Sequence, residues 1–203
     1  MRKIHYLSGV IITIFAGLHL VNHVCSIFGA DTHIEVMDSL RLFYRNIFIE
    51  TILLCAVAVQ IVSGLRLIRA NRKTATSTFD NLHLWTGFYL AIFFVIHVSA
   101  VLAGRFLLNL DTNFYFGVAG LNTFPFNLFF IPYYSLAIIS FFGHVASIHS
   151  KKMKRSFFGL TPAEQSKTIL LVGVVLTILT LFGLTNQFQG VNIPAEYKVL
   201  VGK

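Results

Sequence analysis

Long uncharged stretches alternate with short charged ones along this chain of 203 residues. A helix needs about 20 consecutive apolar residues to cross a bilayer, and each long stretch can supply one. Between Ile47 and Leu65 the only charged residue is Glu50. The pattern therefore predicts an all-α integral membrane protein in which residues 1–203 form a single transmembrane domain. Its five transmembrane helices are expected at residues 4–29, 47–69, 82–104, 126–150 and 168–186.

The segments between these helices carry structural signals of their own. The segment "ADTHIEVMDSLRLFYRN" has the pattern of an amphipathic, partly helical loop. The segment "RFLLNLDTNFYFGVAGLNTFPF" is rich in Gly, Asn and aromatic residues, and we expect it to pack as a cap at the membrane surface. Before the last helix, Thr161, Pro162 and Glu164 form the signature of a helix start with a capping box.

The basic residues predict the orientation of the chain. Cytoplasmic segments of membrane proteins carry an excess of Lys and Arg, and eleven of the sixteen basic residues fall on one side of the predicted helices. We therefore expect a bacterial-type inner (cytoplasmic) membrane, with the N-terminus inside and the C-terminus outside. This topology accounts for the net charge of +8 without a nucleic-acid partner. The eleven residues are Arg2, Lys3, Arg66, Arg69, Arg72, Lys73, Lys151, Lys152, Lys154, Arg155 and Lys167.

Composition supports contact with the lipid bilayer and disfavours two other interpretations. Only 12% of the residues are charged, about half the fraction of a soluble domain. The apolar run after Arg2 and Lys3 is too long for a typical signal peptide, and a second copy of it lies deep in the chain. Cys25 and Cys55 both lie in apolar stretches, so no disulfide or cysteine metal framework is expected.

One sequence pattern occurs twice. "IHYLSGVIITIFAGLH" begins at residue 4 and "LHLWTGFYLAIFFVIH" at residue 82, and both read His, two residues, Ser or Thr, Gly, nine residues, His. The helices that follow them contain "QIVSGLR" from Gln60 and "HVASIHS" from His144, each a polar residue with Ser three positions later. The first four helices are thus expected to form two parallel halves around an axis along the membrane normal. The fifth helix has no counterpart and is expected to be a packing helix.

The spacing of the histidines predicts their depth in the membrane. Fourteen positions along a helix give about 21 Å of rise and return to nearly the same face. His19 and His97 are therefore expected at matching depth in the outer half, and His5 and His83 at the inner surface. Gln60 and His144 are expected to match each other in the inner half. Ionisable residues inside a membrane are costly and are candidates for function.

The pair His19 and His97 suits axial ligation of one haem iron, because two intramembrane imidazoles at equal depth lie on related helices. Gly9 and Gly87 lack a β-carbon, so a flat macrocycle could approach them closely. His23 lies one turn after His19 and could either join a metal cluster with His19 and His97 or serve in packing.

Other polar residues have two interpretations each. Ser8 and Thr86 could bond back to a backbone carbonyl, or reach a haem propionate or a quinone oxygen. Arg66, on the inner side, could pair with a propionate. Glu50 could transfer protons beside a quinone, or could be a carboxylate that reaches to the membrane surface.

At these residues the chain resembles a known family. "KIHYLSGVIITIFAGLHLVNH", "GADTHIEVMDSL", "QIVSGL", "HLWTGFYLAIFFVIH" and "FFGHVASIH" look like the five-helix cytochrome b membrane-anchor subunit of the succinate dehydrogenase and fumarate reductase superfamily, over about residues 3–150. The resemblance implies a four-helix haem-binding bundle with a fifth packing helix. It also implies haem b, a quinone, and cytoplasmic flavoprotein and iron–sulfur subunits docked on the basic inner face. The chain itself has no flavin or cluster motif, so no catalytic residue is expected in it.

The resemblance implies sites for two haems. The family's outer haem falls here on His19 and His97, and its inner haem falls on position 60 and His144. Position 60 is Gln, which is not a usual axial ligand. Two alternatives remain for a second haem: a five-coordinate haem on His144, or ligation by His5 and His83, as in the similar plan of the cytochrome b of respiratory quinol complexes. A single outer haem is the central expectation.

Functions of other classes remain open. The chain could be a non-enzymatic membrane protein of the same fold, either haem-free or acting as a haem- or metal-binding sensor or scaffold, and Gln60 favours this alternative. A histidine-lined transporter is a weaker alternative, because the two halves are parallel and the predicted helices are uninterrupted. A lone outer haem would also lie far from a partner docked on the inner face.

Overall fold

Five long apolar helices make up most of the computed structural model, which describes residues 1–202. All five are long and apolar enough to cross a membrane, which confirms the five predicted spans and the all-α class. They are α1 (Arg2–Cys25, extended by the short η1, Ser26–Phe28), α3 (Ile47–Asn71), α4 (Thr78–Phe106), α6 (Asn127–Lys152) and α7 (Pro162–Leu184). Three shorter helices complete the described chain: α2 (Ala30–Tyr44), α5 (Phe114–Val118) and η2 (Ala195–Val201).

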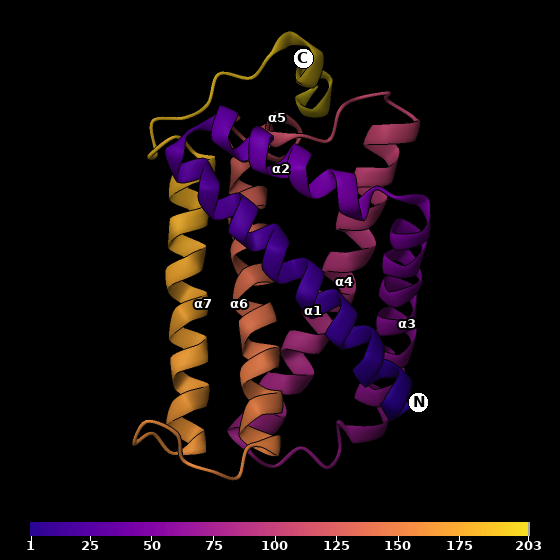
Figure 1. Ribbon diagram of the computed structural model, residues 1–203, viewed down its shortest axis with the longest axis vertical. Coiled ribbons are helices and arrows are strands. Elements are labelled where there is room, and N and C mark those ends of the chain that lie inside the picture. The colour runs from indigo at the N-terminus through magenta and orange to yellow at the C-terminus, as the bar shows by residue number, and fades with distance from the viewer. Residues whose placement is uncertain (203) are drawn as a thin grey trace.

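The long helices form a bundle with two different ends (Figure 1). Helix α1 crosses the bundle diagonally, so that its first half packs against α3 and its far end reaches α7. Helices α4, α6 and α7 stand side by side in that order. The end that contains the N-terminus, the lower end in Figure 1, is called the N-terminal end. The opposite end carries α2, α5 and η2 and is called the capped end.

Polar caps set the starts of two helices at the N-terminal end. Ser77 and Asp80 form a capping box that starts α4 at Thr78, four residues before the predicted start. The hydroxyl of Ser77 accepts a hydrogen bond from the backbone of Asp80 at 3.0 Å, and the Asp80 carboxylate accepts one from the backbone of Ser77 at 3.2 Å. The capping box predicted for Thr161 and Glu164 is confirmed, and α7 begins at Pro162.

The predicted loop segments form the cap at the other end. The segment predicted to be partly helical is α2, which turns back over the bundle from Gly29, where φ is +113°. The aromatic segment after α4 includes α5, which packs over the end of the bundle. Its core joins α5 to the end of α7 through four buried residues: Phe114, Val118, Leu121 and Leu184.

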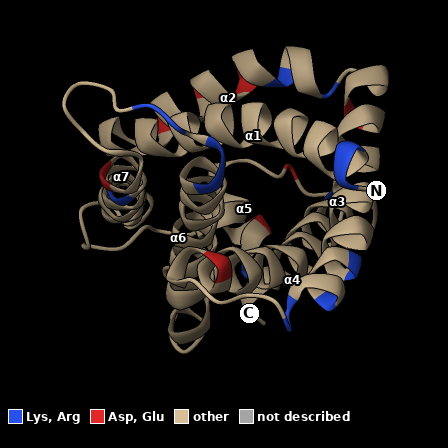
Figure 2. Cartoon of the chain, turned by 90° about the horizontal axis from the view of Figure 1, so that it is seen from below, with Lys and Arg blue, Asp and Glu red and all other residues tan. Residues whose placement is uncertain are grey.

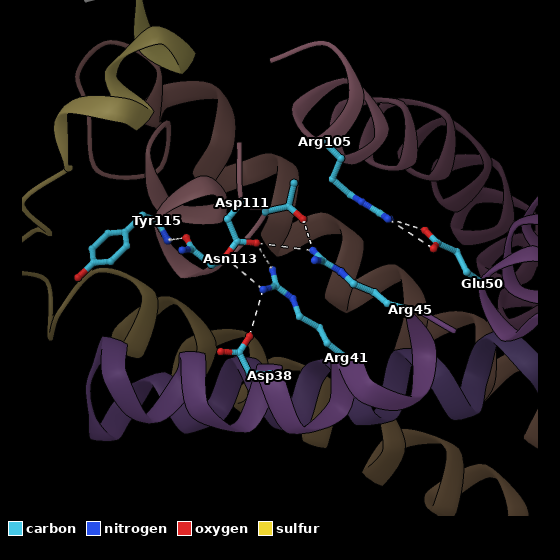
Figure 3. Close-up of polar contacts among 9 residues, drawn as sticks. Asp38, Arg41, Arg45, Glu50, Arg105, Asp111, Asn113 and Tyr115 are labelled. Carbon is cyan, nitrogen blue, oxygen red and sulfur yellow. Dashed lines mark hydrogen bonds and ion pairs between the residues drawn. The ribbon is translucent and has the colours of Figure 1, made fainter. Parts of the chain in front are cut away.

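Ion pairs join neighbouring segments at the capped end (Figure 3). Arg41 on α2 pairs with Asp111, with 2.9 Å between Nη2 and Oδ1, and also with Asp38 on its own helix. Arg105 at the end of α4 pairs with Glu50 at the start of α3. These contacts fix α2 and the segment after α4 against each other.

Helix α7 packs closely against α6 and η1. A β-carbon added at Gly173 would lie 2.5 Å from Cβ of Phe142 on α6. One added at Gly183 would lie 2.7 Å from the backbone nitrogen of Ile27 in η1. Small residues let membrane helices approach closely, because packing rather than the hydrophobic effect drives their association.

Charge is distributed unequally between the two ends. All eleven basic residues predicted for the cytoplasmic side lie at the N-terminal end, where the acidic residues are Asp80 and Glu164. Figure 2 views the molecule from this end, with Lys and Arg in blue and Asp and Glu in red. The other six acidic residues lie at the capped end, together with four of the described basic residues. The N-terminal end is therefore strongly positive and the capped end slightly negative.

Candidate functional site

Seven of the eight histidines gather in two groups, one toward each end of the bundle. The capped-end histidine group consists of His19, His23, His33 and His97. The second group, His5, His83 and His144, lines a cavity at the N-terminal end, called the N-terminal cavity. The eighth, His149, also lines this cavity and bonds to Gln165 through Nε2 at 2.8 Å.

His19 on α1 and His97 on α4 face each other in the capped half. Their ring centres lie 6.3 Å apart, with an angle of 63° between the ring planes. Each ring stacks on a phenylalanine four residues earlier in its own helix: Phe15 on His19, and Phe93 on His97 at 4.9 Å. The repeated sequence pattern is thus also a repeated local structure, and it brings the two predicted ligands together.

A line of hydrogen bonds leads from His19 into the cap. The Nε2 atoms of His19 and His23 lie 3.0 Å apart, and Nδ1 of His23 lies 3.2 Å from Nε2 of His33. Asn22 also bonds to Nε2 of His33, at 3.2 Å. His33 is buried, and burial lowers its pKa to about 4, with smaller lowering by repulsion from His19, when that ring is protonated, and from Arg41. His33 is therefore neutral at physiological pH.

Sequence reasoning gave His33 no role, because its contact with His23 depends on how α2 folds back over the bundle. Within residues 1–202, no group of three or more His, Cys, Asp or Glu residues is arranged to hold a metal ion. The geometry thus gives no support to a metal cluster of His19, His23 and His97.

The N-terminal cavity has a volume of about 910 Å³ and lies between α1, α3, α4 and α6. Its walls are mostly aliphatic and aromatic, and they include Val10, Leu67, Phe94 and Phe141. Ligand pockets in proteins commonly measure about 300–1,000 Å³. Its lining at the bundle end includes three basic residues: Arg2, Lys151 and Lys152.

Four imidazoles line this cavity: those of His5, His83, His144 and His149. Nδ1 of His5 bonds to the hydroxyl of Ser63 on α3 at 2.8 Å. Nδ1 of His144 on α6 lies 3.4 Å from the hydroxyl of Thr86 on α4. The ring of His83 stacks on that of His144, with centres 4.2 Å apart and planes 20° from parallel. The predicted pair His5 and His83 thus lines one cavity, but His83 is held against His144.

Gln60 and His144 occupy matching places in the two halves. A β-carbon on Gly9 would lie 2.7 Å from Nε2 of Gln60, and one on Gly87 would lie 3.1 Å from Cε1 of His144. These two glycines therefore admit the side chain of the neighbouring helix. This contact supports the predicted correspondence between positions 60 and 144.

The other candidate residues bond to protein groups or lie outside the cavity. Ser8 bonds back to the carbonyl of Ile4 at 2.9 Å, and Thr86 bonds back to that of Leu82 at 2.6 Å. Glu50 is paired with Arg105 near the capped end. Arg66 is exposed and does not line the N-terminal cavity.

The basic side chains that line the cavity are instead those of Arg2, Lys151 and Lys152. Lys151 pairs with Asp80 at 2.8 Å, and Nζ of Lys152 lies 3.8 Å from the ring centre of Tyr6. The sequence run "KKMKR" predicts positive charge at this end of the bundle. It does not indicate which of its residues line the cavity.

Comparisons with models of known protein families, with curated proteins and with solved structures find no match for this chain. A function therefore has to be argued from the residues of the chain itself.

Proposed function

We propose that this chain is a membrane-embedded b-type cytochrome that carries electrons between a quinone and a partner redox subunit. The observation that carries the proposal is the pair His19 and His97, whose ring centres lie 6.3 Å apart on two membrane helices. Two imidazoles bound to opposite sides of one metal ion, with metal–nitrogen bonds of about 2 Å, have ring centres about 6 Å apart. The spacing of this pair suits the two axial ligands of a haem iron.

The surrounding residues suit the two imidazoles to this role. Phe15 and Phe93 stack on the rings and limit their rotation. Nε2 of His19 bonds to His23, so ligation through that atom exchanges the bond to His23 for one to iron. His33 and Asn22 hold the far side of this line of side chains. If haem b were bound by His19 and His97, it would supply a reversible one-electron carrier in the capped half of the bundle.

The charge of the N-terminal end supports a docked partner. Eleven basic residues against two acidic ones give this end a strong positive potential. Complementary charge steers the association of protein surfaces and fixes their orientation. In the proposed complex a flavoprotein and an iron–sulfur subunit dock here on the cytoplasmic side, because an excess of Lys and Arg marks that side of a membrane protein.

One observation favours the second candidate function, a haem-free scaffold or sensor of the same fold. Three of the four imidazoles in the capped-end histidine group are already joined by hydrogen bonds, from His19 through His23 to His33. Buried polar side chains that satisfy one another in this way can hold helices together without a cofactor.

Haem content separates the two candidates. The chain is purified from cells supplied with haem, and bound haem is measured in the wild type and in His19→Ala, His97→Ala and His149→Ala. The first two variants should lose the haem bound at the capped end. His149→Ala is the control for the capped-end pair, because His149 lies at the N-terminal end of the bundle, where it bonds to Gln165, and this variant should keep the haem bound at the capped end.

Equal haem content in all four proteins would overturn the assignment of His19 and His97. A wild-type protein that is folded and monodisperse but free of haem would favour the scaffold or sensor.

A further inference from the structure

The connection between α6 and α7 presents two aromatic side chains away from the rest of the fold. Phe157 is 64% exposed and Phe158 is 88% exposed. Their ring centres lie 4.3 Å apart, with 62° between the ring planes, so the two rings pack mainly on each other. Neither residue belongs to a membrane-spanning helix, where exposed apolar side chains simply face lipid. Exposed apolar groups of this kind mark surfaces that associate with a membrane or a protein.

These two residues lie in a tight turn, Phe157–Leu160, called the aromatic hairpin. Phe157 and Leu160 exchange two backbone hydrogen bonds, of 3.1 Å and 3.0 Å. At the tip φ is +48° for Phe158 and +75° for Gly159. A positive φ is uncommon for a bulky residue, and the two hydrogen bonds hold Phe158 in this conformation. The hairpin therefore keeps the Phe158 ring at its tip.

One glutamine ties the aromatic hairpin to both neighbouring helices. Nε2 of Gln165, in the first turns of α7, donates to the carbonyl of Leu160 at 2.8 Å and to that of Arg155 at 3.2 Å. Its Oε1 lies 2.8 Å from Nε2 of His149 on α6. The hairpin is thus held at the level where α6 ends and α7 begins.

The connection between α6 and α7 extends sideways from the bundle, beside α7 (Figures 1 and 2). A segment that projects sideways at the level of the helix ends meets the bilayer, at the boundary between its headgroups and acyl chains. A protein docked on the N-terminal end would instead lie below the bundle. The position of the hairpin therefore favours lipid as its partner.

Positive charge that is not paired within the described chain precedes the hairpin. Lys154 and Arg155 are exposed, and neither forms an ion pair with any of residues 1–202. The nearest carboxylate in the sequence, that of Glu164, accepts a hydrogen bond from the backbone of Thr161 at 2.7 Å as part of the helix cap. Lys and Arg at a membrane surface attract anionic lipids.

We propose that the aromatic hairpin is a binding element for anionic phospholipid. Phe157 and Phe158 enter the boundary between headgroups and acyl chains, where amphipathic segments place their aromatic residues. Lys154 and Arg155 contact the phosphate groups of the same leaflet. In the predicted orientation this is the cytoplasmic leaflet. The inference is independent of haem, and it gives the α6–α7 connection a role beyond joining two helices.

The first test locates the hairpin tip with a fluorescent reporter. Trp85 is the only tryptophan of the chain, so Trp85→Phe combined with Phe158→Trp leaves one indole at the tip. The control combines Trp85→Phe with Thr76→Trp, because Thr76 is exposed in the connection between α3 and α4, which runs below the bundle. Both proteins are reconstituted in vesicles of phosphatidylcholine and phosphatidylglycerol. Each emission is taken relative to that of the same variant without quencher.

Lipids brominated in the upper part of the acyl chain should quench the tip reporter more strongly than the control reporter. Iodide in the aqueous phase should quench the control reporter more strongly. If iodide reaches both reporters equally and brominated lipid reaches neither, the tip lies in water. That result would overturn the inference and leave the hairpin as a surface for a protein.

The second test asks whether the hairpin prefers anionic lipid. The tip reporter is placed in phosphatidylcholine vesicles that contain a small fraction of brominated phosphatidylglycerol, or the same fraction of brominated phosphatidylcholine. The anionic form should quench more, because each Lys or Arg near the surface favours anionic lipid by about fivefold. Added salt should reduce this preference, because it screens exposed charges.

Lys154→Gln combined with Arg155→Gln should remove the preference and leave the depth of the reporter unchanged. The backbone carbonyl of Arg155, which bonds to Gln165, is retained in this variant. The matched control is Arg72→Gln combined with Lys73→Gln, which removes the same charge from the same end and should keep the preference. Equal quenching by both lipids in the reporter protein, or equal loss of preference in the two double variants, would contradict lipid binding by this hairpin.

Discussion

The side-chain amide of Gln60 donates a hydrogen bond of 2.6 Å to the backbone carbonyl of His5 and so joins α3 to α1. At the matching position of the other half, His144 contacts Thr86 and stacks on His83. The two halves of the bundle therefore share one backbone plan but differ in the chemistry of one position. Position 60 holds helices together, whereas position 144 presents an imidazole to a cavity.

Replacing Gln60 tests this structural role. Gln60→Leu keeps a similar volume but removes the donor, and a hydrogen bond of this kind contributes about 1 kcal/mol. We expect the melting temperature of the detergent-solubilised protein to fall, while Gln60→Glu, which lacks the amide donor, should lower it as well. If both variants melt at the wild-type temperature, the bond does not hold α1 against α3.

The contact between α7 and η1 gives a second prediction. In Gly183→Ala the added carbon would lie 2.7 Å from the backbone nitrogen of Ile27, which cannot move without shifting η1. Overpacking of this kind costs about 1–3 kcal/mol, so thermal unfolding should occur at a lower temperature. Gly17→Ala is the control, because nothing lies within 4 Å of the added carbon. Equal melting temperatures for the two variants would show that η1 does not pack as described.

Because Glu50 on α3 pairs with Arg105 on α4, we expect the effects of replacing the two residues on unfolding free energy to be coupled. Their side chains are 21% and 22% exposed. A double-mutant cycle with Glu50→Gln and Arg105→Gln should give a coupling of about 1 kcal/mol in unfolding free energy. Asp80 and Lys151, which are 31% and 42% exposed, should show a smaller coupling. Additive effects of the Glu50 and Arg105 substitutions would contradict the pairing.

His33 predicts a dependence of stability on pH. Because burial lowers its pKa to about 4 from 6.5, the folded protein resists protonation at His33 while the unfolded chain accepts it. The contribution of neutral His33 to the free energy of unfolding is therefore complete above about pH 6.5. It is lost as the pH falls toward about 4, and the total loss is about 3 kcal/mol.

His33→Gln removes this titration and keeps an amide for hydrogen bonds to Asn22 and His23. The measurement is the unfolding free energy of wild type and variant from pH 7.5 to pH 4. Their difference removes the contributions of the other histidines, and the wild type should lose stability more steeply. Parallel curves would mean that His33 is accessible to protons in the folded protein.

The sequence predicted the membrane helices well, because a span depends on local composition and on satisfying every backbone group within one helix. The repeat was also visible, since His19 and His97 stand at the same position in two copies of one spaced pattern. The start of α4 at Thr78 was missed, because Ser77 and Asp80 are polar residues that resemble a loop until their capping box is seen.

The site was less accessible to sequence reasoning, because it depends on contacts between helices. The rotation of each helix about its axis decides which basic residues border the N-terminal cavity, and the sequence does not give that rotation. Arg66 was therefore a candidate, whereas in the structure Lys151 lines the cavity. The contact of His33 with His23 depends on the turn at Gly29 and on the path of α2. The partner of Gln60 lies fifty-five positions away in the chain.

The most direct test of the central claim is the absorption spectrum of the chain purified from haem-replete cells, recorded before and after reduction. Ligation of haem iron by His19 and His97 predicts a sharp α band and a sharp Soret band in the reduced protein, both unchanged by carbon monoxide. Both bands should disappear from the capped-end haem in His97→Ala. A folded, colourless wild-type protein would contradict the assignment of this chain as a cytochrome.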